Sequence, residues 1–220
     1  MIKLENVTKI YGKDGSKTVA LDGVDLEIKD GEMVAIMGPS GSGKSTMLNI
    51  IGAMDDLTDG KYFFGDQEVS SLRGNKLHEF RKNNISFVFQ NFALMNNYTV
   101  FENVELPLLS KRLSSRKRKE IVNEKLKIMG IDDLAKKYPT KISGGQQQRC
   151  AIARALASGN ELILADEPTG ALDRKTGEDI MEAFTKLNEM GKTVIIITHD
   201  EHVAKKCQRI VHINDGKIEA

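Results

Sequence analysis

The most constraining feature of this chain is a glycine-rich segment set between an apolar run and a helical pattern. Residues 33–37 read MVAIM, residues 38–46 read GPSGSGKST, and residues 47–51 continue as MLNII. This order is strand, loop and helix, with the pattern G-x-x-x-x-G-K-[ST] in the loop. Glycines let such a loop turn its N–H groups inward around phosphate oxygens, and the helix start adds partial positive charge. The segment therefore predicts a nucleoside triphosphate site.

Within this loop, residue chemistry suggests separate roles. Lys44 is expected to reach the β- and γ-phosphates, and Ser45 is expected to ligate Mg²⁺. The residues predicted to bind the nucleotide here are Gly38, Pro39, Ser40, Gly41, Ser42, Gly43, Lys44, Ser45 and Thr46.

The composition fits one α/β domain, with room for an inserted lobe, in a chain of 220 residues. The 32 Lys and Arg nearly balance the 31 Asp and Glu, so charge gives no indication of a nucleic-acid partner. No signal peptide is recognisable, and no apolar run approaches the roughly 18 residues needed to cross a membrane. Cys150 and Cys207 have neither metal-site nor redox spacing, so both are expected to be core or helix residues.

The N-terminal pattern predicts a small antiparallel sheet. Residues 2–8 alternate apolar and polar, residues 12–16 read as a turn, and residues 19–28 resume a strand with a break at residues 22–23. Tyr11 stands just before the turn. It is either an ordinary edge aromatic or a surface on which a base stacks, and the pattern leaves both open.

Polar side chains follow the ends of several predicted strands. The strand at residues 85–89, preceded by one at 61–64, ends at Gln90, which could reach Mg²⁺ or water. The run at residues 161–165 closes with Asp166 and Glu167. Because ligands of open α/β sheets bind at the carboxyl ends of strands, these two acids suit a Mg²⁺ ligand and a base. The strand at residues 193–197 leads to His199, either a structural residue or a phosphate contact.

From about residue 91 to residue 159 the pattern becomes helical. Helices are predicted at residues 100–109 and 116–129, and a third follows residues 142–146 and runs to about residue 157. Ser143, Gly144 and Gly145 stand before this third helix, either as a second anion-binding helix start or simply as a capped turn. A basic run at residues 111–119 is expected to be a solvated helix start rather than a lipid contact.

The rest of the chain predicts a helix at residues 176–190 and a closing pair of strands at residues 207–213 and 217–218.

Taken together, these stretches resemble the ATP-binding subunits of ABC transporters over essentially the whole chain. The motifs that carry the resemblance are Tyr11 (aromatic loop), Gly38 to Thr46 (Walker A), Gln90 (Q-loop), Ile142 to Gln146 (signature), Leu162 to Glu167 (Walker B), Ala171 to Asp173 (D-loop) and His199 (switch histidine). Residues 87–92, 102–108, 146–149 and 168–173 most resemble the group of macrolide exporters, lipoprotein-release ATPases and antimicrobial-peptide transporters. Ile142 stands where the signature usually begins with Leu.

The resemblance implies an α/β fold, a P-loop NTPase (RecA-like) core with an N-terminal antiparallel β-subdomain and an inserted α-helical subdomain. Residues 1–90 and 160–220 would form the core and β-subdomain, and residues about 91–159 the helical subdomain. No regulatory C-terminal domain is expected, because the chain stops soon after its last strand. A homodimer would form on ATP binding, with each ATP between one P-loop and the facing signature. Two separate anion-binding helix starts in one chain agree with this.

The resemblance also assigns chemistry to individual residues. Glu167 would polarise the attacking water, His199 would contact the γ-phosphate, and Gln90 would sense Mg²⁺ held by Ser45 and Asp166. The cofactors would be ATP and Mg²⁺. Tyr11 would stack on adenine, with phenylalanine serving nearly as well. The residues expected to complete the nucleotide site from the second subunit are Ser143, Gly144, Gly145, Gln146 and Asp173.

The expected function is an ATPase that powers an integral membrane permease from the cytoplasmic face of the cell membrane, exporting or releasing a peptide, lipoprotein or antibiotic. The helical lobe, especially residues 92–109, would receive the permease. One alternative is a non-transport ABC ATPase that signals through a membrane partner to cell-wall or cell-division enzymes. Another, acting on ribosomes or DNA, predicts fused ATPase domains, a coiled-coil insertion or a basic face, none of which is visible in the sequence.

Overall fold

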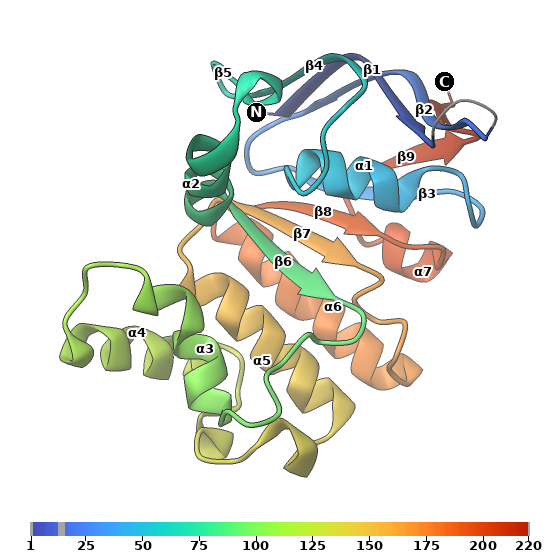
Figure 1. The fold of residues 1–220 in the computed structure, drawn as a ribbon. Helices are drawn as coiled ribbons and strands as arrows, with labels where there is room; N and C mark the ends of the chain where they lie inside the picture. The colour runs from blue at the N-terminus through green and yellow to red at the C-terminus, as the bar shows by residue number, and fades with distance from the viewer. Residues whose placement is uncertain (1, 13–15, 220) are drawn as a thin grey trace.

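The computed structural model describes residues 2–12 and 16–219, which form two β-sheets and several helices (Figure 1). The larger sheet has the order β10-β9-β3-β8-β7-β6 and is parallel except for its edge strand β10. Its strands are β3 (Met33–Met37), β6 (Ile85–Phe89), β7 (Leu162–Asp166), β8 (Thr193–Ile197), β9 (Arg209–Asn214) and β10 (Lys217–Ile218). The smaller, antiparallel sheet has the order β2-β1-β4-β5. Its strands are β1 (Ile2–Tyr11), β2 (Thr18–Ile28), β4 (Asp59–Phe64) and β5 (Gln67–Glu68).

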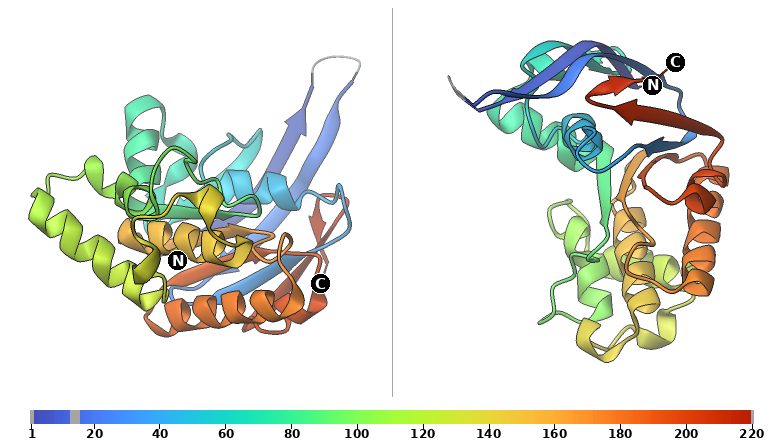
Figure 2. Two further views of the ribbon diagram at one scale, coloured as in Figure 1. Left: turned by 90° about the horizontal axis from the view of Figure 1, so that it is seen from below. Right: turned by 90° about the vertical axis from the view of Figure 1, so that its right-hand side faces the viewer.

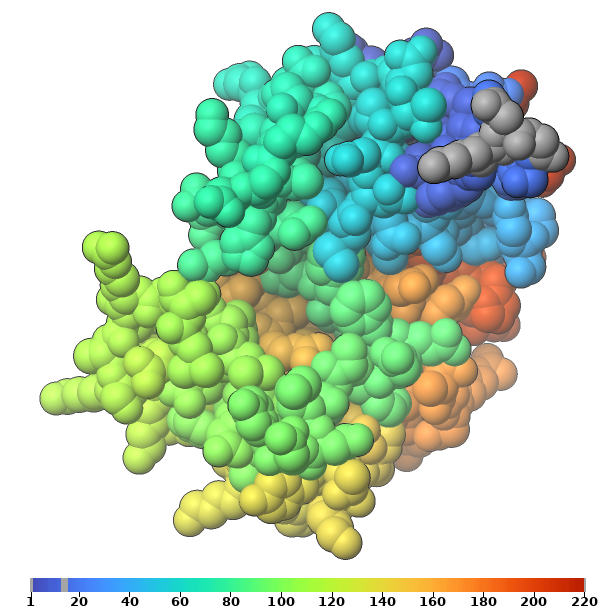
Figure 3. Space-filling view, viewed as in Figure 1, coloured from blue at the N-terminus to red at the C-terminus, as the bar shows by residue number. Residues whose placement is uncertain are grey.

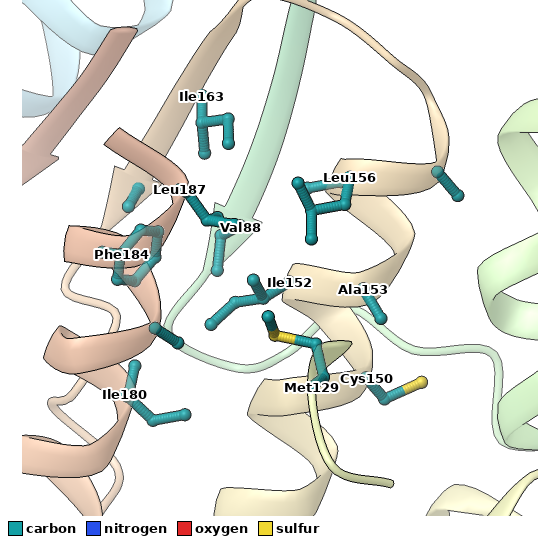
Figure 4. Packing of buried hydrophobic residues seen from close by; sticks show 14 of the residues in the cluster. Val88, Met129, Cys150, Ile152, Ala153, Leu156, Ile163, Ile180, Phe184 and Leu187 are labelled. Carbon is teal, nitrogen blue, oxygen red and sulfur yellow. The ribbon is translucent and has the colours of Figure 1, made fainter. Parts of the chain in front are cut away.

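The central strands β3, β7 and β8 are almost entirely apolar and buried because both faces of their sheet are covered. Successive side chains of a strand point to opposite faces. In β7, Leu162 and Leu164 pack with the antiparallel sheet and α1 (Lys44–Ile51), whereas Ile163 and Ala165 pack toward α5 (Gly144–Ala157) and α6 (Arg174–Glu189). Figure 4 shows this second core from close by, with β-strand and helix side chains meeting between α5 and α6. The sheet therefore separates α1 from α5, as the right-hand view in Figure 2 also indicates.

Helix α1 lies between the two sheets, and its apolar residues explain why it stays there. Met47, Leu48, Ile50 and Ile51 are buried against both sheets. The buried hydroxyl of Tyr62 in β4 donates a hydrogen bond to the Ile51 carbonyl at the end of the helix. The antiparallel sheet is thus fixed directly to the helix that follows the glycine-rich loop.

Three helices form a lobe between β6 and β7: α3 (Val100–Leu109), α4 (Ser115–Ile128) and α5. Helix α3 begins with a capping box between Thr99 and Glu102. Asn103, which is fully buried, donates from its amide to the carbonyls of Met95, Tyr98 and Thr99 and accepts from the Met95 N–H. This one side chain fixes the loop that leads from β6 into the lobe. The predicted α/β class, with an antiparallel sheet before the parallel one and an inserted helical region, is confirmed.

Several boundaries differ from the sequence prediction. Strand β1 runs to Tyr11 rather than residue 8, α1 begins at Lys44, α6 begins at Arg174, and β9 begins at Arg209 rather than residue 207. Two helices were not predicted at all: α2 (Gly74–Asn84) and the short α7 (Glu201–Ala204). The turn predicted at residues 12–16 falls largely outside the described residues. Within the part of the chain that the structure describes, no helix has the length and apolar content required to span a bilayer.

Candidate active site

The glycine-rich loop connects β3 to α1 at the carboxyl edge of the parallel sheet. The Lys44 ammonium donates hydrogen bonds to the carbonyls of Gly38 and Pro39, both at 2.7 Å. The side chain therefore folds back over the loop and closes it into a ring. These neutral carbonyls are weaker partners for an ammonium than phosphate oxygens are, so a bound triphosphate can displace them.

Two glycines of this loop are required by close packing. A Cβ on Gly38 would lie 2.0 Å from the Ile213 carbonyl oxygen of β9. Gly43 has a φ of +105°, and its Cβ would lie 2.5 Å from the Ala20 carbonyl oxygen of β2. The loop is thus wedged between β9 and the antiparallel sheet, which holds its backbone in one shape.

The start of α1 is open. Gly43 is the N-cap residue, and no side chain among the described residues caps the helix there. The first N–H groups of a helix lack partners within it, and an anion is favoured at this position. The buried hydroxyl of Ser42 also has no hydrogen-bond partner among the described residues. The loop therefore offers a set of unused donors suited to phosphate.

Acidic groups stand beside this loop at the end of β7. Strand pairing aligns Phe89 of β6, Asp166 of β7 and Ile197 of β8, so the polar residues that follow these strands lie at one edge. Burial and the neighbouring Glu167 charge raise the pKa of Asp166, while the Lys44 ammonium opposes the rise. A partly buried carboxylate close to the loop lysine is the expected position for a cation that bridges protein and phosphate.

Glu167 is held in an unusual backbone conformation. Its φ of +44° is in the left-handed region, and its N–H donates to the Ile197 carbonyl at 2.9 Å. Its carboxylate accepts from the His199 N–H at 3.1 Å and from the Thr198 hydroxyl at 3.4 Å, and Oε1 lies 2.6 Å from His199 Nδ1. An ionised carboxylate only accepts hydrogen bonds, so Nδ1 donates to it. The structure thus joins the predicted base to the predicted histidine.

Gln90 lies in the exposed turn after β6, next to the loop that follows Glu167. A Cβ on Gly170 would lie 2.8 Å from Gln90 Nε2, so the Gln90 amide lies directly against this glycine. Beyond Gln90, Phe92 and Ala93 both have positive φ, +62° and +46°. Arg154 of α5 donates to the carbonyls of both residues, at 3.0 and 2.5 Å. Arg154, which the sequence prediction did not single out, therefore fixes the segment between Gln90 and the helical lobe.

The second predicted anion site, at the start of α5, is a capped helix start. The Ser143 side chain accepts from the Gln146 N–H, and the Gln146 side chain accepts from the Ser143 N–H, at 3.3 and 2.9 Å. A Cβ on Gly145 would lie 2.3 Å from Thr176 Cγ2, at the start of α6. Asp173 caps α6 and binds the same threonine, accepting from its hydroxyl at 2.6 Å and from its N–H at 3.1 Å. These residues lie together, but across the sheet from α1.

Comparison with known proteins agrees with this geometry. The family model described as ABC transporter matches residues 21–170. The uncharacterized ABC transporter ATP-binding protein MJ0796 of Methanocaldococcus jannaschii is 50% identical, over 100% of this chain and 95% of that protein. The chain belongs to the ABC transporter family.

Other relatives place this ABC ATPase more narrowly. The macrolide export ATP-binding/permease protein MacB of Pasteurella multocida is 42% identical over 99% of this chain, which spans only 34% of that longer protein. A dimeric structure of MJ0796 in a post-hydrolysis state with ADP and Pi has a TM-score of 0.91 at 48% identity, covering 100% of this chain and 97% of that one. The P-loop NTPase fold and the ATPase class are thereby confirmed, and ATP is the nucleotide.

The remaining predicted residue of this ABC ATPase, Tyr11, lies at the end of β1 with 39% of its surface exposed. Its hydroxyl donates to Asp55 Oδ2 at 2.6 Å. The sequence left two interpretations of Tyr11 open, and neither included a charged partner for its hydroxyl, which the structure provides. Lys9 and Asp55, which the sequence prediction missed, carried no local signal, because their contacts join residues 46 positions apart.

Proposed function

We propose that this ABC ATPase binds Mg²⁺-ATP in the loop around Lys44, hydrolyses it, and drives a permease that exports or releases a peptide, lipoprotein or antibiotic. The observation that carries the proposal is the shared edge at which the Lys44 loop, Asp166 and the Glu167–His199 pair meet. Residues 1–220 would act as one ATPase domain, with residues about 91–159 as the lobe that contacts the permease. The similarity to MacB supports the export direction.

The donor set fits Mg²⁺. This ion usually binds one or two carboxylates and completes its coordination with phosphate oxygens and water. Asp166, Ser45 and Gln90 supply one carboxylate, one hydroxyl and one amide, and no cluster of three His, Cys, Asp or Glu side chains suited to a metal ion is found in the described ranges 2–12 and 16–219. The ion would therefore arrive with ATP, and it would neutralise phosphate charge there.

The chain's own residues divide the hydrolytic work. Lys44 and the free N–H groups at the start of α1 would stabilise charge on the β- and γ-phosphates. Glu167 would polarise the attacking water, which requires its carboxylate to stay in one position. His199 holds that carboxylate through Nδ1 and its own N–H. Phosphate oxygens only accept, so a contact from Nε2 to the γ-phosphate requires a ring that carries a proton on both nitrogens. His199 would thus serve both the base and the phosphate.

A second subunit would complete each site. The α1 and α5 starts belong to opposite faces of the parallel sheet, so one chain is poorly arranged to bring both onto one phosphate chain. In a two-fold dimer, each phosphate chain can meet both starts at once. The residues proposed to act across this interface are Ser143, Gly144, Gly145, Gln146 and Asp173. The dimeric structures of MJ0796 support such an assembly.

The permease would dock beside the helical lobe. Figure 3 shows a hollow between the lobe and the part of the core around α2 and β6. This groove of about 390 Å³ is lined by residues of both parts, including Phe87 of β6, Leu106 and Pro107 of α3, and Arg154 of α5. A partner in the groove would contact Arg154, whose guanidinium holds Phe92 and Ala93 in the segment that follows Gln90. The protein would then lie peripherally at the cytoplasmic face of the cell membrane.

Phosphate release from ATP by the purified chain, with and without Mg²⁺, tests the catalytic part of this proposal. We expect release with Mg²⁺ and only background release when the ion is chelated. Equal rates in both conditions would exclude Mg²⁺ as the cofactor.

Co-expression with the permease tests the docking groove. Leu106→Glu places a charge in the groove and is expected to abolish co-purification. Met190→Glu is the matched control, because Met190 is 55% exposed at the end of α6 and outside the groove. Unchanged co-purification of the Leu106→Glu variant would exclude this groove as the docking surface.

A further inference from the structure

A charged pair lies behind the exposed ring of Tyr11. Lys9 Nζ donates to Asp55 Oδ1 at 2.7 Å and to the Asp56 carbonyl at 2.5 Å, and it lies 4.8 Å from the centre of the Tyr11 ring. Only 9% of Lys9 is exposed, compared with 39% of Tyr11. A cation over the face of a tyrosine ring is attracted by the π-electrons. One face of the ring is thus covered by a buried cation.

The Tyr11 hydroxyl provides a second point of attachment. It donates to Asp55 Oδ2 at 2.6 Å, while Asp55 Oδ1 accepts from Lys9. Burial and the hydrogen bond to Asp55 raise the pKa of Tyr11 above its ordinary value, and a hydrogen bond with the Thr46 side chain opposes the rise. The Asp55 carboxylate thus fixes the ring through the hydroxyl and through Lys9.

Asp55 is itself fixed to the helix that receives the phosphates. Its N–H and that of Met54 both donate to the Asn49 carbonyl in the last turn of α1, at 3.2 and 2.8 Å. The same loop is attached to β1, since the Thr58 N–H donates to the Thr8 carbonyl and the Thr58 hydroxyl accepts from the Ile10 N–H. The ring of Tyr11 is therefore held relative to α1, whose opposite end begins at Lys44.

We infer that Asp55 is a positioning residue for adenine binding. Its carboxylate orients the Tyr11 ring for stacking, and Lys9 is the fixed counter-ion of that carboxylate. This inference rests on the proposed role of Tyr11 as the adenine platform. A ring held in place before binding loses less conformational freedom when the base arrives. The Tyr11 hydroxyl therefore contributes to ATP affinity. Tyr11→Phe is expected to weaken ATP binding, whereas the sequence alone predicted a nearly neutral substitution.

Affinity for Mg²⁺-ATP, compared with affinity for Mg²⁺-tripolyphosphate, tests the inference, because tripolyphosphate has phosphates but no base. Tyr11→Phe keeps the Lys9–Asp55 pair and removes only the hydroxyl. We expect it to weaken ATP binding roughly three- to tenfold, the size of one hydrogen bond or one immobilised side chain, and to leave tripolyphosphate binding unchanged. Unchanged ATP affinity, or equal weakening of both ligands, would overturn the inference.

A second variant removes the positioning group without leaving a buried charge alone. Lys9→Met with Asp55→Ala should weaken ATP binding to a similar extent and spare tripolyphosphate, and adding Tyr11→Phe to it should have no further effect. Asp56→Ala is the matched control, because Asp56 takes part only through its backbone, with the carbonyl accepting from Lys9 and the N–H donating to Asp55 Oδ1. Full additivity of Tyr11→Phe in this background would contradict a role through Asp55.

Tyr11→Ala separates this inference from the proposed function. If Tyr11→Ala leaves ATP affinity unchanged, the stacking role itself is wrong. If Tyr11→Ala weakens ATP binding while Tyr11→Phe and the Lys9→Met, Asp55→Ala variant do not, stacking stands and the positioning role of Asp55 is wrong. Thermal unfolding of each variant confirms that the folded protein is being compared.

Discussion

Two helices of this ABC ATPase begin at predicted phosphate sites, and the structure builds these starts differently. Helix α1 begins at Lys44 after the N-cap residue Gly43, which is in the left-handed region, and no side chain of the described residues caps it. Helix α5 begins with a reciprocal cap between Ser143 and Gln146. The first start leaves its N–H donors free for a nucleotide that binds to the same subunit. The second is already stable without a ligand, which is what a surface needs if it meets phosphate only when another subunit presents it.

The neighbours of the two starts differ as well. Gly43 packs against the Ala20 carbonyl in the antiparallel sheet, whereas Gly145 packs against Thr176 at the start of α6. A displacement of the first start on nucleotide binding would thus pass to the sheet that carries Tyr11. A displacement of the second start would pass to the loop that runs from Glu167 to Asp173. We therefore expect the first start to bind the nucleotide and the second to link dimer contact to the hydrolytic residues.

The largest effect is expected when the negative charge of Glu167 is removed. Glu167→Gln keeps the shape of the side chain but loses the negative charge that polarises water. Turnover should fall by ~10²–10⁴-fold, as for other general bases, while ATP affinity is retained. Steady-state phosphate release together with equilibrium ATP binding measures both. Glu161→Gln, just before the opposite end of β7, is the control and should leave both unchanged.

The Glu167→Gln variant should also hold ATP long enough to stabilise a dimer, because a ligand that binds only the closed state favours it. Light scattering should show a monomer without nucleotide and a dimer with ATP. Turnover within tenfold of the unmodified protein would show that Glu167 is not the base.

Loss of the ammonium at the first helix start is expected to have a smaller effect. Lys44→Ala should weaken ATP affinity by on the order of 10²-fold, because hydrogen bonds to charged groups are lost at the phosphates. Titration with Mg²⁺-ATP measures this, and Lys61→Ala in β4 serves as a control on an exposed lysine. Unchanged affinity would remove the Lys44 loop from the nucleotide site.

The smallest effect should come from crowding the second helix start. In Gly145→Ala the new Cβ would meet Thr176 Cγ2, and rotating the threonine would break its hydroxyl bond to Asp173. Overpacking of this kind costs about 1–3 kcal/mol, so ATP-dependent dimerisation should weaken roughly tenfold while ATP binding by the monomer is spared.

Adding Thr176→Ser to Gly145→Ala removes the clashing methyl, keeps the hydroxyl and should restore dimerisation. The variant Gly144→Ala is the milder control, since its Cβ would come no closer than 3.4 Å to Leu172. Failure of Thr176→Ser to rescue dimerisation would show that the clash is not the cause.

Much of the hydrolytic edge could be predicted from the sequence. The Lys44 loop has a specific motif, and Asp166, Glu167 and His199 follow apolar runs whose parallel pairing brings their ends together. The bond between Glu167 and His199 follows from that pairing, although its geometry depends on the positive φ of Glu167. The carboxyl edge of the sheet could therefore be predicted because its strands are parallel.

Helix α2 and several long-range contacts could not be predicted, because no local sequence pattern indicates them. Helix α2 buries little, with Phe80 as its one buried residue, and it begins after Arg73 without a side-chain cap from the described residues, so it lacks both periodicity and a start signal. Arg154 contacts Phe92 and Ala93 across about 60 residues, and Gly145 meets Thr176 across about 30. Such long-range contacts depend on how the lobe docks against the core, which no sequence window contains.

The central claim, that each phosphate chain is held by α1 of one subunit and α5 of the other, is tested most directly by mixing two defective variants in the Glu167→Gln background. Lys44→Ala removes the first site and Ser143→Arg blocks the second, so neither should dimerise alone with ATP. Their equimolar mixture contains pairs with one intact composite site. Light scattering, at an ATP concentration that saturates the Glu167→Gln parent but not the Lys44→Ala variant, should show dimers only in the mixture. A mixture that stays monomeric, while the Glu167→Gln parent dimerises, would contradict a site shared between subunits.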